Sequence, residues 1–432
     1  MGLLFQMFTF SQTLIINLLL KREFIITASL GPDGNRSMMG TGQLSDRQKF
    51  RFLFRLEISM ICGQMKLTIG QEELNAGLQS VQNVVSTRTT LPILSNVLLK
   101  AEGDSLSLTA TDLDVTISNA VEAKVELSGS FTLPVKKLVS IAREMGGSQI
   151  ELEVKGSQCT IQCGSSFYKV NGLAAEEFPP MPDFSGQTKL KMDQAKVKSM
   201  LRRTSYAVST DENRYVLNGL YLSFKENKLT IVATDGRRLA LAEEDLELPE
   251  GSQTDAIVPT KAIQELGRLL ADEGEVELQL TENQVSFTLK NESGNETLIV
   301  SKLVEGAYPN YKQVIPAESK ERVTMDKEEL QHALRRAEIM TSDKSNSVKM
   351  TFSENNLTIT SNSPEVGESR ETMAINYKGE EVSIAFNPQF FIDPLKVLDE
   401  DEVHFEFTDQ LSPGVVKTNH PFLYVIMPMR TS

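Results

Sequence analysis

The chain has 432 residues, of which 40% are hydrophobic, and a formal net charge of −14. This length predicts about two to four domains with packed cores. The acidic balance excludes a surface that is basic overall, so contact with nucleic acid would require a local basic patch. The three cysteines predict neither a disulfide framework nor a metal site, and are typical of a reducing, cytoplasmic compartment.

Residues 1–64 differ from the rest of the chain. Their opening run, "MGLLFQMFTFSQTLIINLLLKREF", is apolar, but polar residues such as Gln6 and Asn17 interrupt it and its charges come after the apolar part. A signal peptide carries its charges in front, and a membrane span tolerates few interruptions. We therefore expect no membrane span and no secretion signal. Because the organised pattern begins at Met65, we expect residues 1–64 to be a poorly ordered extension or an upstream, mis-assigned start.

Three segments open alike and indicate an internal repeat. They are "KLTIGQEELNAGLQSVQNVVS" from Lys66, "KLKMDQAKVKSMLRRTSYAVS" from Lys189 and "RVTMDKEELQHALRRAEIMTS" from Arg322. Each predicts a short strand followed by a helix. In every copy a hairpin-like pair of strands follows, and then a second helix that begins at a proline. The predicted fold class is α+β, with two helices and antiparallel sheets in each of three repeated domains.

The repeat also predicts where the chain divides. A period this long is not that of a stacked solenoid, so we expect three separate cores lying side by side. The predicted boundaries are residues 1–64 for the extension and residues 65–186, 187–317 and 318–432 for the three domains.

The repeats and a set of short motifs resemble a known family. The motifs are "TLPILSN", "RYVLNG", "VATDGRRLA", "YPNYKQVIP" and "YVIMPMR", and the resemblance from Met65 to about Arg430 is to the β subunit of bacterial DNA polymerase III, the replicative sliding clamp. It implies a clamp fold, a head-to-tail homodimer closing as a ring around double-stranded DNA, and no enzymatic activity. The implied partners are the DNA polymerase III catalytic subunit, the clamp loader, other polymerases and repair proteins.

The residues themselves offer little that suits an enzyme. Only His332, His404 and His420 are available, and no Gly-rich phosphate loop, nucleophile elbow or metal-ligand spacing occurs. Asp112 and Asp235 stand at strand ends, where aspartate is typical of turns. We expect no cofactor. Two functions remain open: a tether that encircles DNA, which the repeats and motifs favour, and an acidic peptide-binding scaffold without DNA, which composition alone favours.

Basic side chains lie opposite the apolar stripe of the predicted helices. In the second copy Val197, Met200 and Leu201 form the stripe, and in the third Leu330 and Leu334 do. One outward arginine pair is typical of a solvated helix face, but its recurrence in an acidic chain favours phosphate contacts that read no bases. The first copy carries its basic residues in a loop and on its second helix. The predicted DNA-facing residues are Arg88, Lys136, Lys137, Arg143, Lys196, Lys198, Arg202, Arg203, Arg214, Arg335 and Arg336.

Two features predict how the ring closes. Ile339 projects from the wet face of its helix, with Met340 on the flank. The strand "SSFYKVN" would be an open sheet edge that presents Phe167 and Val170. If this edge pairs with the third domain of a second chain, both features become buried and a two-fold ring closes. These four residues are the predicted dimer interface.

The resemblance implies a groove between the second and third domains that receives a short linear peptide from partners. Methionines and branched aliphatics suit an adaptable apolar pocket, and the arginines after Asp235 could fix the peptide's polar end. A last core strand at "YVIMPMR" is the alternative, although Pro428 does not suit a central strand. The implied groove residues are Leu217, Thr234, Gly236, Arg237, Arg238, Leu239, Pro309, Val314, Leu411, Val425, Ile426, Met427, Pro428, Met429 and Arg430.

Overall fold

A computed structural model describes residues 28–30, 36–38, 64–85, 91–249, 251–290, 296–342 and 346–430. The chain divides into two units, residues 1–62 and 63–432, which are described separately. In the first unit β1 (Ala28–Leu30) and β2 (Arg36–Met38) pair antiparallel. Poor order is expected for residues 1–64, and apart from these two strands and Gln64 they lie outside the described residues. No helix in the described ranges is long and apolar enough to cross a membrane.

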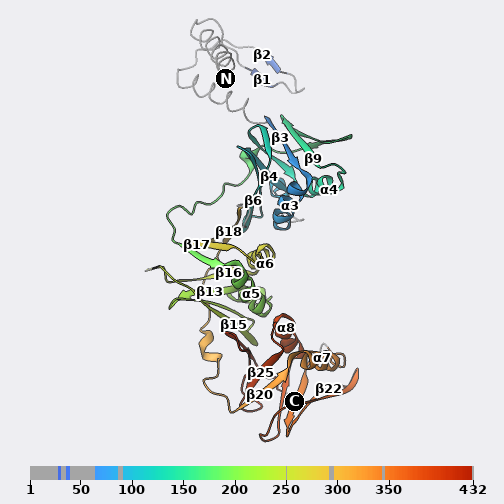
Figure 1. Cartoon of the computed structure of the whole chain (residues 1–432), viewed down its shortest axis with the longest axis vertical. Coiled ribbons are helices and arrows are strands. Elements are labelled where there is room, and N and C mark those ends of the chain that lie inside the picture. Colours follow the sequence, from blue (N-terminus) through green and yellow to red (C-terminus); the bar gives the residue numbers. More distant parts are fainter. Residues whose placement is uncertain are drawn as a thin grey trace. The chain divides into compact units, whose positions relative to one another are not determined.

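Each repeat of the second unit contributes two helices, whose order can be followed in Figure 1. They are α3 (Gln71–Val81) and α4 (Val135–Glu144), α5 (Gln194–Thr204) and α6 (Thr260–Leu269), and α7 (Lys327–Glu338) and α8 (Pro388–Val397). The side chains of Asp193 and Asp326 cap α5 and α7 by accepting backbone N–H groups. Proline precedes α4 and α6 and is the first residue of α8, so the predicted helix starts are confirmed.

The strands form four sheets in this unit, and all their pairings are antiparallel. The first sheet contains β11 (Ser166–Asn171), β10 (Gln158–Cys163), β9 (Gln149–Lys155), β3 (Gln64–Gly70) and β7 (Lys124–Leu127), in this order. The second contains β12 (Lys189–Asp193), β17 (Glu275–Leu280), β18 (Gln284–Lys290), β19 (Glu296–Lys302), β6 (Val115–Glu122), β5 (Ser105–Thr111), β4 (Asn96–Glu102) and β8 (Gly129–Pro134).

The other two sheets belong to the second and third repeats. The third sheet contains β16 (Thr254–Pro259), β13 (Gly219–Lys225), β14 (Lys228–Thr234), β15 (Arg238–Asp245), β27 (Phe422–Ile426), β26 (Gly414–Lys417), β25 (Glu402–Phe407) and β20 (Glu321–Asp326). The fourth contains β23 (Gly367–Ala374), β22 (Asn356–Ser363), β21 (Val348–Ser353) and β24 (Val382–Phe386).

Two of these sheets continue from one repeat into the next. β6 of the first repeat pairs with β19 of the second, with Ile117 opposite Ile299. β15 of the second repeat pairs with β27 of the third, with Ala240 opposite Tyr424. The predicted cores are connected through these shared strands, because buried apolar residues from Met65 to Ile426 form one continuous cluster. The predicted domain boundaries stay a prediction.

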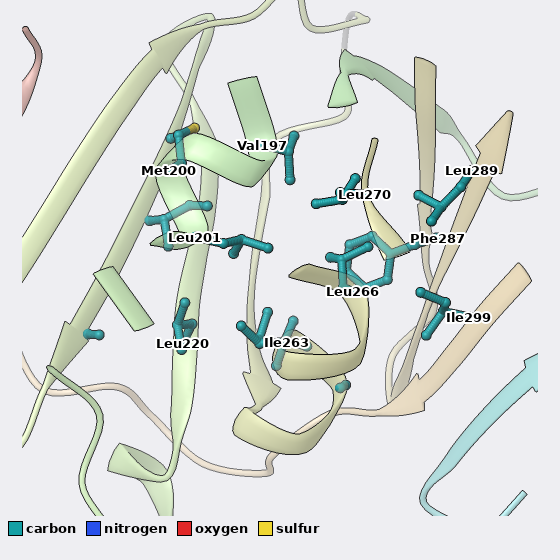
Figure 2. Close-up of a cluster of buried hydrophobic side chains, with 14 of the residues drawn as sticks. Val197, Met200, Leu201, Leu220, Ile263, Leu266, Leu270, Phe287, Leu289 and Ile299 are labelled. Carbon is teal, nitrogen blue, oxygen red and sulfur yellow. The ribbon is translucent and has the colours of Figure 1, made fainter. Parts of the chain in front are cut away.

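Figure 2 shows how the helices of the second repeat pack on their strands. Val197 and Leu201 of α5 and Ile263 and Leu266 of α6 are buried in one cluster with residues of the sheets. Ile299 of the cross-repeat strand β19 belongs to the same cluster. The predicted apolar stripe of α5 is therefore confirmed, and the cluster reaches the strand that joins two repeats.

The six described helices of the second unit form a continuous row. α4 contacts α3, where the Gln71 side chain donates to the Ala142 carbonyl at 2.8 Å. α6 contacts α3 through Arg268 and also packs on α5. α8 contacts both α5 and α7. The order of the row is α4, α3, α6, α5, α8, α7, so α4 and α7 are its ends.

Candidate functional site

A small apolar cluster lies where the second and third repeats share a sheet. Val232, Leu239 and Val425, from β14, β15 and β27, are buried in it, apart from the main core. Tyr221 and Tyr308 pack against them and stack on each other with ring centroids 5.0 Å apart. Because successive residues of a strand face opposite sides of a sheet, these strands bury apolar side chains on both faces.

Exposed apolar side chains adjoin this cluster in the sequence. Val314 stands between Tyr311 and Ile315, both of which pack on the cluster, yet it is 43% exposed. Met427 and Met429 follow β27 and are also exposed. Their backbones are fixed nonetheless, because the Met427 N–H donates to the Arg237 carbonyl at 2.9 Å and the Met429 N–H to that of Ala385 at 2.7 Å. We define Val314, Met427 and Met429 as the apolar patch.

The turn between β14 and β15 supports this junction. The Asp235 carboxylate accepts the backbone N–H groups of Arg237 and Arg238 at 2.8 and 3.0 Å. Gly236 has φ +83°, and a Cβ there would lie 2.9 Å from Nη1 of Arg214. That nitrogen donates to the Asp235 carbonyl at 2.8 Å. This conformation favours glycine, and a Cβ there would require the end of the Arg214 side chain to shift. Arg214, predicted to face DNA, thus lies at this turn.

Arg238 is committed to contacts within the chain. Its Nη1 lies 2.6 Å from the Asp393 carboxylate, its Nε 3.1 Å from that of Asp235, and its Nη2 2.7 Å from the Tyr206 carbonyl. The side chain is 11% exposed and lies over the Phe390 ring. The expectation that Arg238 holds the polar end of a peptide is not supported by this arrangement. Arg237 is exposed and remains available for that role.

The other predicted groove residues do not all reach one surface. Ile426 is fully buried in the main core, because it alternates with Val425 on β27, so its side chain cannot line a groove. Leu217 and Thr234 are also buried, whereas Pro309 and Arg430 are exposed and Pro428 is half-buried.

Leu411 is not among the side chains that pack on the cluster. It is exposed on a turn in which the Asp409 carboxylate accepts the N–H groups of Leu411 and Ser412. These hydrogen bonds hold the pKa of Asp409 below its usual value. The Asp409 carboxylate thus holds the backbone of this turn through two hydrogen bonds.

The junction between the first and second repeats provides an internal comparison. Lys302 occupies the place of Met427 there, since its N–H donates to the Asp114 carbonyl as that of Met427 does to Arg237. The Lys302 ammonium pairs with the Asp114 carboxylate at 3.0 Å. Leu113 has φ +79° at the position of Gly236. The patch is therefore a property of the second junction and not of the repeat.

The predicted DNA-facing cations of the second repeat all face carboxylates. Arg203 is only 13% exposed and lies 3.5 Å from Glu400. The prediction that its side chain faces solvent is wrong, because the third repeat covers this side of α5. The pairs are Lys196 with Glu244, Lys198 with Asp272, Arg202 with Asp399, Arg203 with Glu400 and Arg214 with Asp211.

The ends of the helix row carry cations of a different kind. Lys136, Lys137 and Arg143 on α4 and Arg335 on α7 are exposed, and within the described chain they form no ion pair. Arg336 pairs with Glu371 at 2.7 Å. Arg88, the remaining predicted residue, lies outside the described residues.

Two of the predicted dimer residues lie on an edge strand, and the other two follow α7. β11 is one edge strand of the first sheet, so the predicted open edge is confirmed, and β23 is one edge strand of the fourth. Phe167 is exposed, while Val170 packs partly against the core. Ile339 is 70% exposed after α7, and Met340 beside it is half-buried. The exposure predicted for Ile339 is thus confirmed.

Groups that could hold a metal are not found among the described residues. The thiols of Cys159 and Cys163 are buried and free. The carboxylate of Asp112 accepts backbone N–H groups of its own turn, as that of Asp235 does.

Comparisons with known proteins agree with this architecture. The chain matches family profiles for the N-terminal, central and C-terminal domains of the DNA polymerase III beta subunit at residues 65–182, 191–310 and 312–430. It is 38% identical over 367 residues to the beta sliding clamp of Chlamydia muridarum, covering 85% of this chain and 99% of that protein. It is 37% identical over 378 residues to that of Caulobacter vibrioides, covering 85% and 100%.

Solved structures show the same similarity. The sliding clamp of Pseudomonas aeruginosa bound to griselimycin has a TM-score of 0.80 at 34% identity, and that of Bacillus subtilis 0.81 at 31%. Each match covers 85% of this chain and 100% of the other. Three clamp domains of α+β topology define the class. The chain belongs to the DNA polymerase III beta subunit family of replicative sliding clamps.

Proposed function

We propose that two copies of this chain close head to tail into a ring around double-stranded DNA. The ring tethers the DNA polymerase III catalytic subunit and catalyses no reaction itself. It also docks the clamp loader, other polymerases and repair proteins, in the cytoplasm. Membership of the family supports this function, and the observation that carries it is the pair of open edges on β11 and β23.

These edges are the missing half of a regular pattern. At each of the two junctions inside the chain, the third strand between the two helices of one repeat pairs with the last strand of the next repeat. β6 thus pairs with β19, and β15 with β27. β23 is the corresponding third strand of the third repeat, and β11 the corresponding last strand of the first. A second copy supplies the partner for each, and two such contacts close a two-fold ring.

The pairing of β11 with β23 of another copy would form a third junction, between copies. The register of the two junctions inside the chain predicts the register of this one. Ser369 corresponds to Ala240, because each lies opposite the equivalent position of the strand before it in its own repeat. By the same criterion Tyr168 corresponds to Tyr424. Because Ala240 lies opposite Tyr424, Ser369 would face Tyr168. The neighbouring positions then place Glu368 opposite Lys169. Opposite charges in facing strand positions are favourable, which supports the pairing.

Ile339 fits the same correspondence. It occupies the position that Tyr206 has after α5, and Tyr206 contacts Tyr424 across the second junction with ring centroids 5.6 Å apart. In the ring Ile339 would therefore cover the exposed Tyr168 of the other copy. Its burial would remove a large apolar side chain from water.

Phosphates would be contacted by cations on the helix row. Closing the ring continues the row from α7 of one copy to α4 of the other. Lys137 and Arg335 carry no carboxylate partner in the described chain, so their charge is free for phosphate, whereas that of Lys198 or Arg202 is already matched. Attraction to phosphates carries no sequence information and so allows sliding.

The apolar patch would receive the partner peptide. Met427 and Met429 are exposed on a fixed backbone, and flexible thioethers adapt to more than one ligand. Val314 and the cluster around Leu239 and Val425 supply the remaining apolar surface. Arg237 is the exposed cation beside them. Several partners could use this one surface in turn.

The test is retention on DNA of different topology. A fluorescent preparation is loaded by a clamp loader and ATP onto nicked circular DNA, and the circle is then cut once. We expect the protein to stay on the circle through gel filtration and to leave within minutes of cutting. Equal retention on circular and linear DNA would overturn encirclement. Peptide binding without any retention on the circle would favour the acidic scaffold.

A further inference from the structure

One face of α6 joins the second repeat to the first. Lys261 and Arg268, seven residues apart on this face, both reach across the junction. Lys261 pairs with Asp112, and Arg268 donates to the carbonyl oxygens of Gln79 at 3.2 Å and Ser80 at 2.7 Å. These carbonyls belong to the last turn of α3, where a helix leaves acceptors unsatisfied and favours a cation.

α4 is the counterpart of α6 in the first repeat. Each helix follows a proline and has ten residues, so Lys136 and Arg143 occupy the places of Lys261 and Arg268. Both side chains are exposed. Neither makes an ion pair or a side-chain hydrogen bond to any part of the chain that the structure describes. The face by which α6 contacts α3 is thus also present on α4, but there these two side chains contact no part of the described chain.

The end of α7 offers the matching acceptors. Arg335 and Arg336 occupy the places of Gln79 and Ser80 in the repeat. In a continuing helix the Met340 N–H would donate to the Arg336 carbonyl. Here it donates to the Ala337 carbonyl instead. The side chain of Arg336 is turned toward Glu371. The last turn of α7 therefore has a carbonyl without its helical donor, as expected at a helix end.

At the second junction, acidic side chains contact the end of the corresponding helix, α5. There Asp399 and Glu400, just after α8, pair with the arginines of α5. The corresponding residues after α4 are Gly146 and Gly147. They carry no charge, so the acidic contacts of the second junction have no counterpart just after α4.

We infer that Lys136 and Arg143 are subunit-junction residues. Arg143 of one copy donates to the carbonyl oxygens at the end of α7 of the other copy, and Lys136 lies on the same face beside it. This inference rests on the proposed ring. It removes both residues from the DNA-facing set, in which the sequence had placed them.

The first measurement is the dissociation constant of the dimer, from sedimentation velocity over a dilution series. For Arg143→Ala combined with Lys136→Ala we expect an increase of about tenfold to about a hundredfold, as for hydrogen bonds to charged groups. Arg143→Lys should give an intermediate value, because it keeps the charge but loses the planar fork. Lys155→Ala, at an exposed surface pair in the same repeat, should leave the constant unchanged.

The second measurement separates a junction role from a DNA role. Binding of a short duplex is followed against salt at protein concentrations far above the dimer dissociation constant. We expect the double variant to keep the wild-type salt slope. A slope reduced by about 0.9 for each lost phosphate contact, with an unchanged dimer, would overturn the inference. A wild-type protein that is monomeric at every concentration would instead overturn the ring itself.

Discussion

Arg238 and Asp393 join the second repeat to the third, with Nη1 of the arginine 2.6 Å from Oδ2 of the aspartate. Both side chains are mostly buried. The same guanidinium bonds the Asp235 carboxylate and the Tyr206 carbonyl, so one side chain connects the β14–β15 turn, the segment after α5 and α8. Leu239, the next residue of β15, belongs to the apolar cluster. Adjacent residues of β15 thus hold the junction and contribute to the apolar cluster.

Replacing Arg238 should destabilise the fold. In Arg238→Ala the largely buried carboxylates of Asp235 and Asp393 lose the guanidinium that pairs with both, which costs about 3–5 kcal/mol of unfolding free energy. Urea unfolding followed by circular dichroism measures this loss. The neighbouring Arg237→Ala is the matched control, and as an exposed residue it should change stability by less than about 0.5 kcal/mol. Equal effects of the two variants would show that Arg238 does not hold the junction.

The register of the third junction can be tested by exchanging charges. Lys169→Glu alone and Glu368→Lys alone should each weaken the dimer, since each places like charges opposite one another across β11 and β23. The double variant should recover most of the lost affinity. Sedimentation gives the dissociation constants. Additive losses in the double variant would mean that these two residues do not face each other.

The exposed end of α7 should decide the oligomeric state. Ile339→Lys with Met340→Lys places two charges where the ring buries apolar surface, so we expect a monomer by light scattering at micromolar concentration. Leu411→Lys, at an equally exposed leucine in the same repeat, is the control and should remain dimeric. A dimer that survives the double change would contradict the proposed seam.

Cys159 should give the fold a dependence on alkaline pH. Burial raises the pKa of its thiol to about 12. An unfolded thiol ionises near pH 8.5, so the unfolded state loses a proton first. The contribution is neutral below that pH, and stability falls by up to about 1.4 kcal/mol per pH unit above it. Unfolding measured from pH 8 to pH 10 should therefore show a smaller loss in Cys159→Ala than in the wild type. Equal losses would contradict burial of the thiol.

Local features of this fold could be predicted from the sequence, and long-range ones could not. The caps at Asp193 and Asp326 and the prolines before α4 and α6 act within one helical turn, so their patterns suffice. The pairing of β15 with β27 joins strands far apart in the chain and gave no local signal. For the same reason helical periodicity placed Arg203 in solvent, although Glu400 of the next repeat covers it.

The site shows the same limit on a finer scale. The resemblance supplied Val425 and Ile426 together, but the alternation of a strand sends one to the patch side and the other into the main core. The identity of a residue did not reveal that Arg238 would be engaged by Asp393. Conversely, exposure at Ile339 followed from helical spacing alone, because nothing in the described chain covers that face.

The role of the apolar patch in peptide binding can be tested by a variant that does not disturb the core. Leu239 is buried, so Leu239→Ala would leave a cavity that costs about 2–5 kcal/mol and would confuse binding with stability. Deleting residues 427–432 would remove two backbone hydrogen bonds along with the methionines. Met427→Ala and Val314→Ala, both at exposed side chains, remove apolar surface from the patch and leave the cluster beneath intact.

For Met427→Ala with Val314→Ala we expect at least a tenfold loss of affinity for a peptide of the Gln-Leu-Phe type, with a dimer as stable as the wild type. The reason is that partner contacts here would be made by side chains rather than by the backbone, whose N–H groups are engaged at Met427 and Met429. Fluorescence anisotropy with a labelled peptide measures the affinity, and Leu411→Ala in the same assay reports whether the Asp409 turn contributes. An affinity within about twofold of the wild type, a difference of only ~0.4 kcal/mol, would place the peptide site elsewhere.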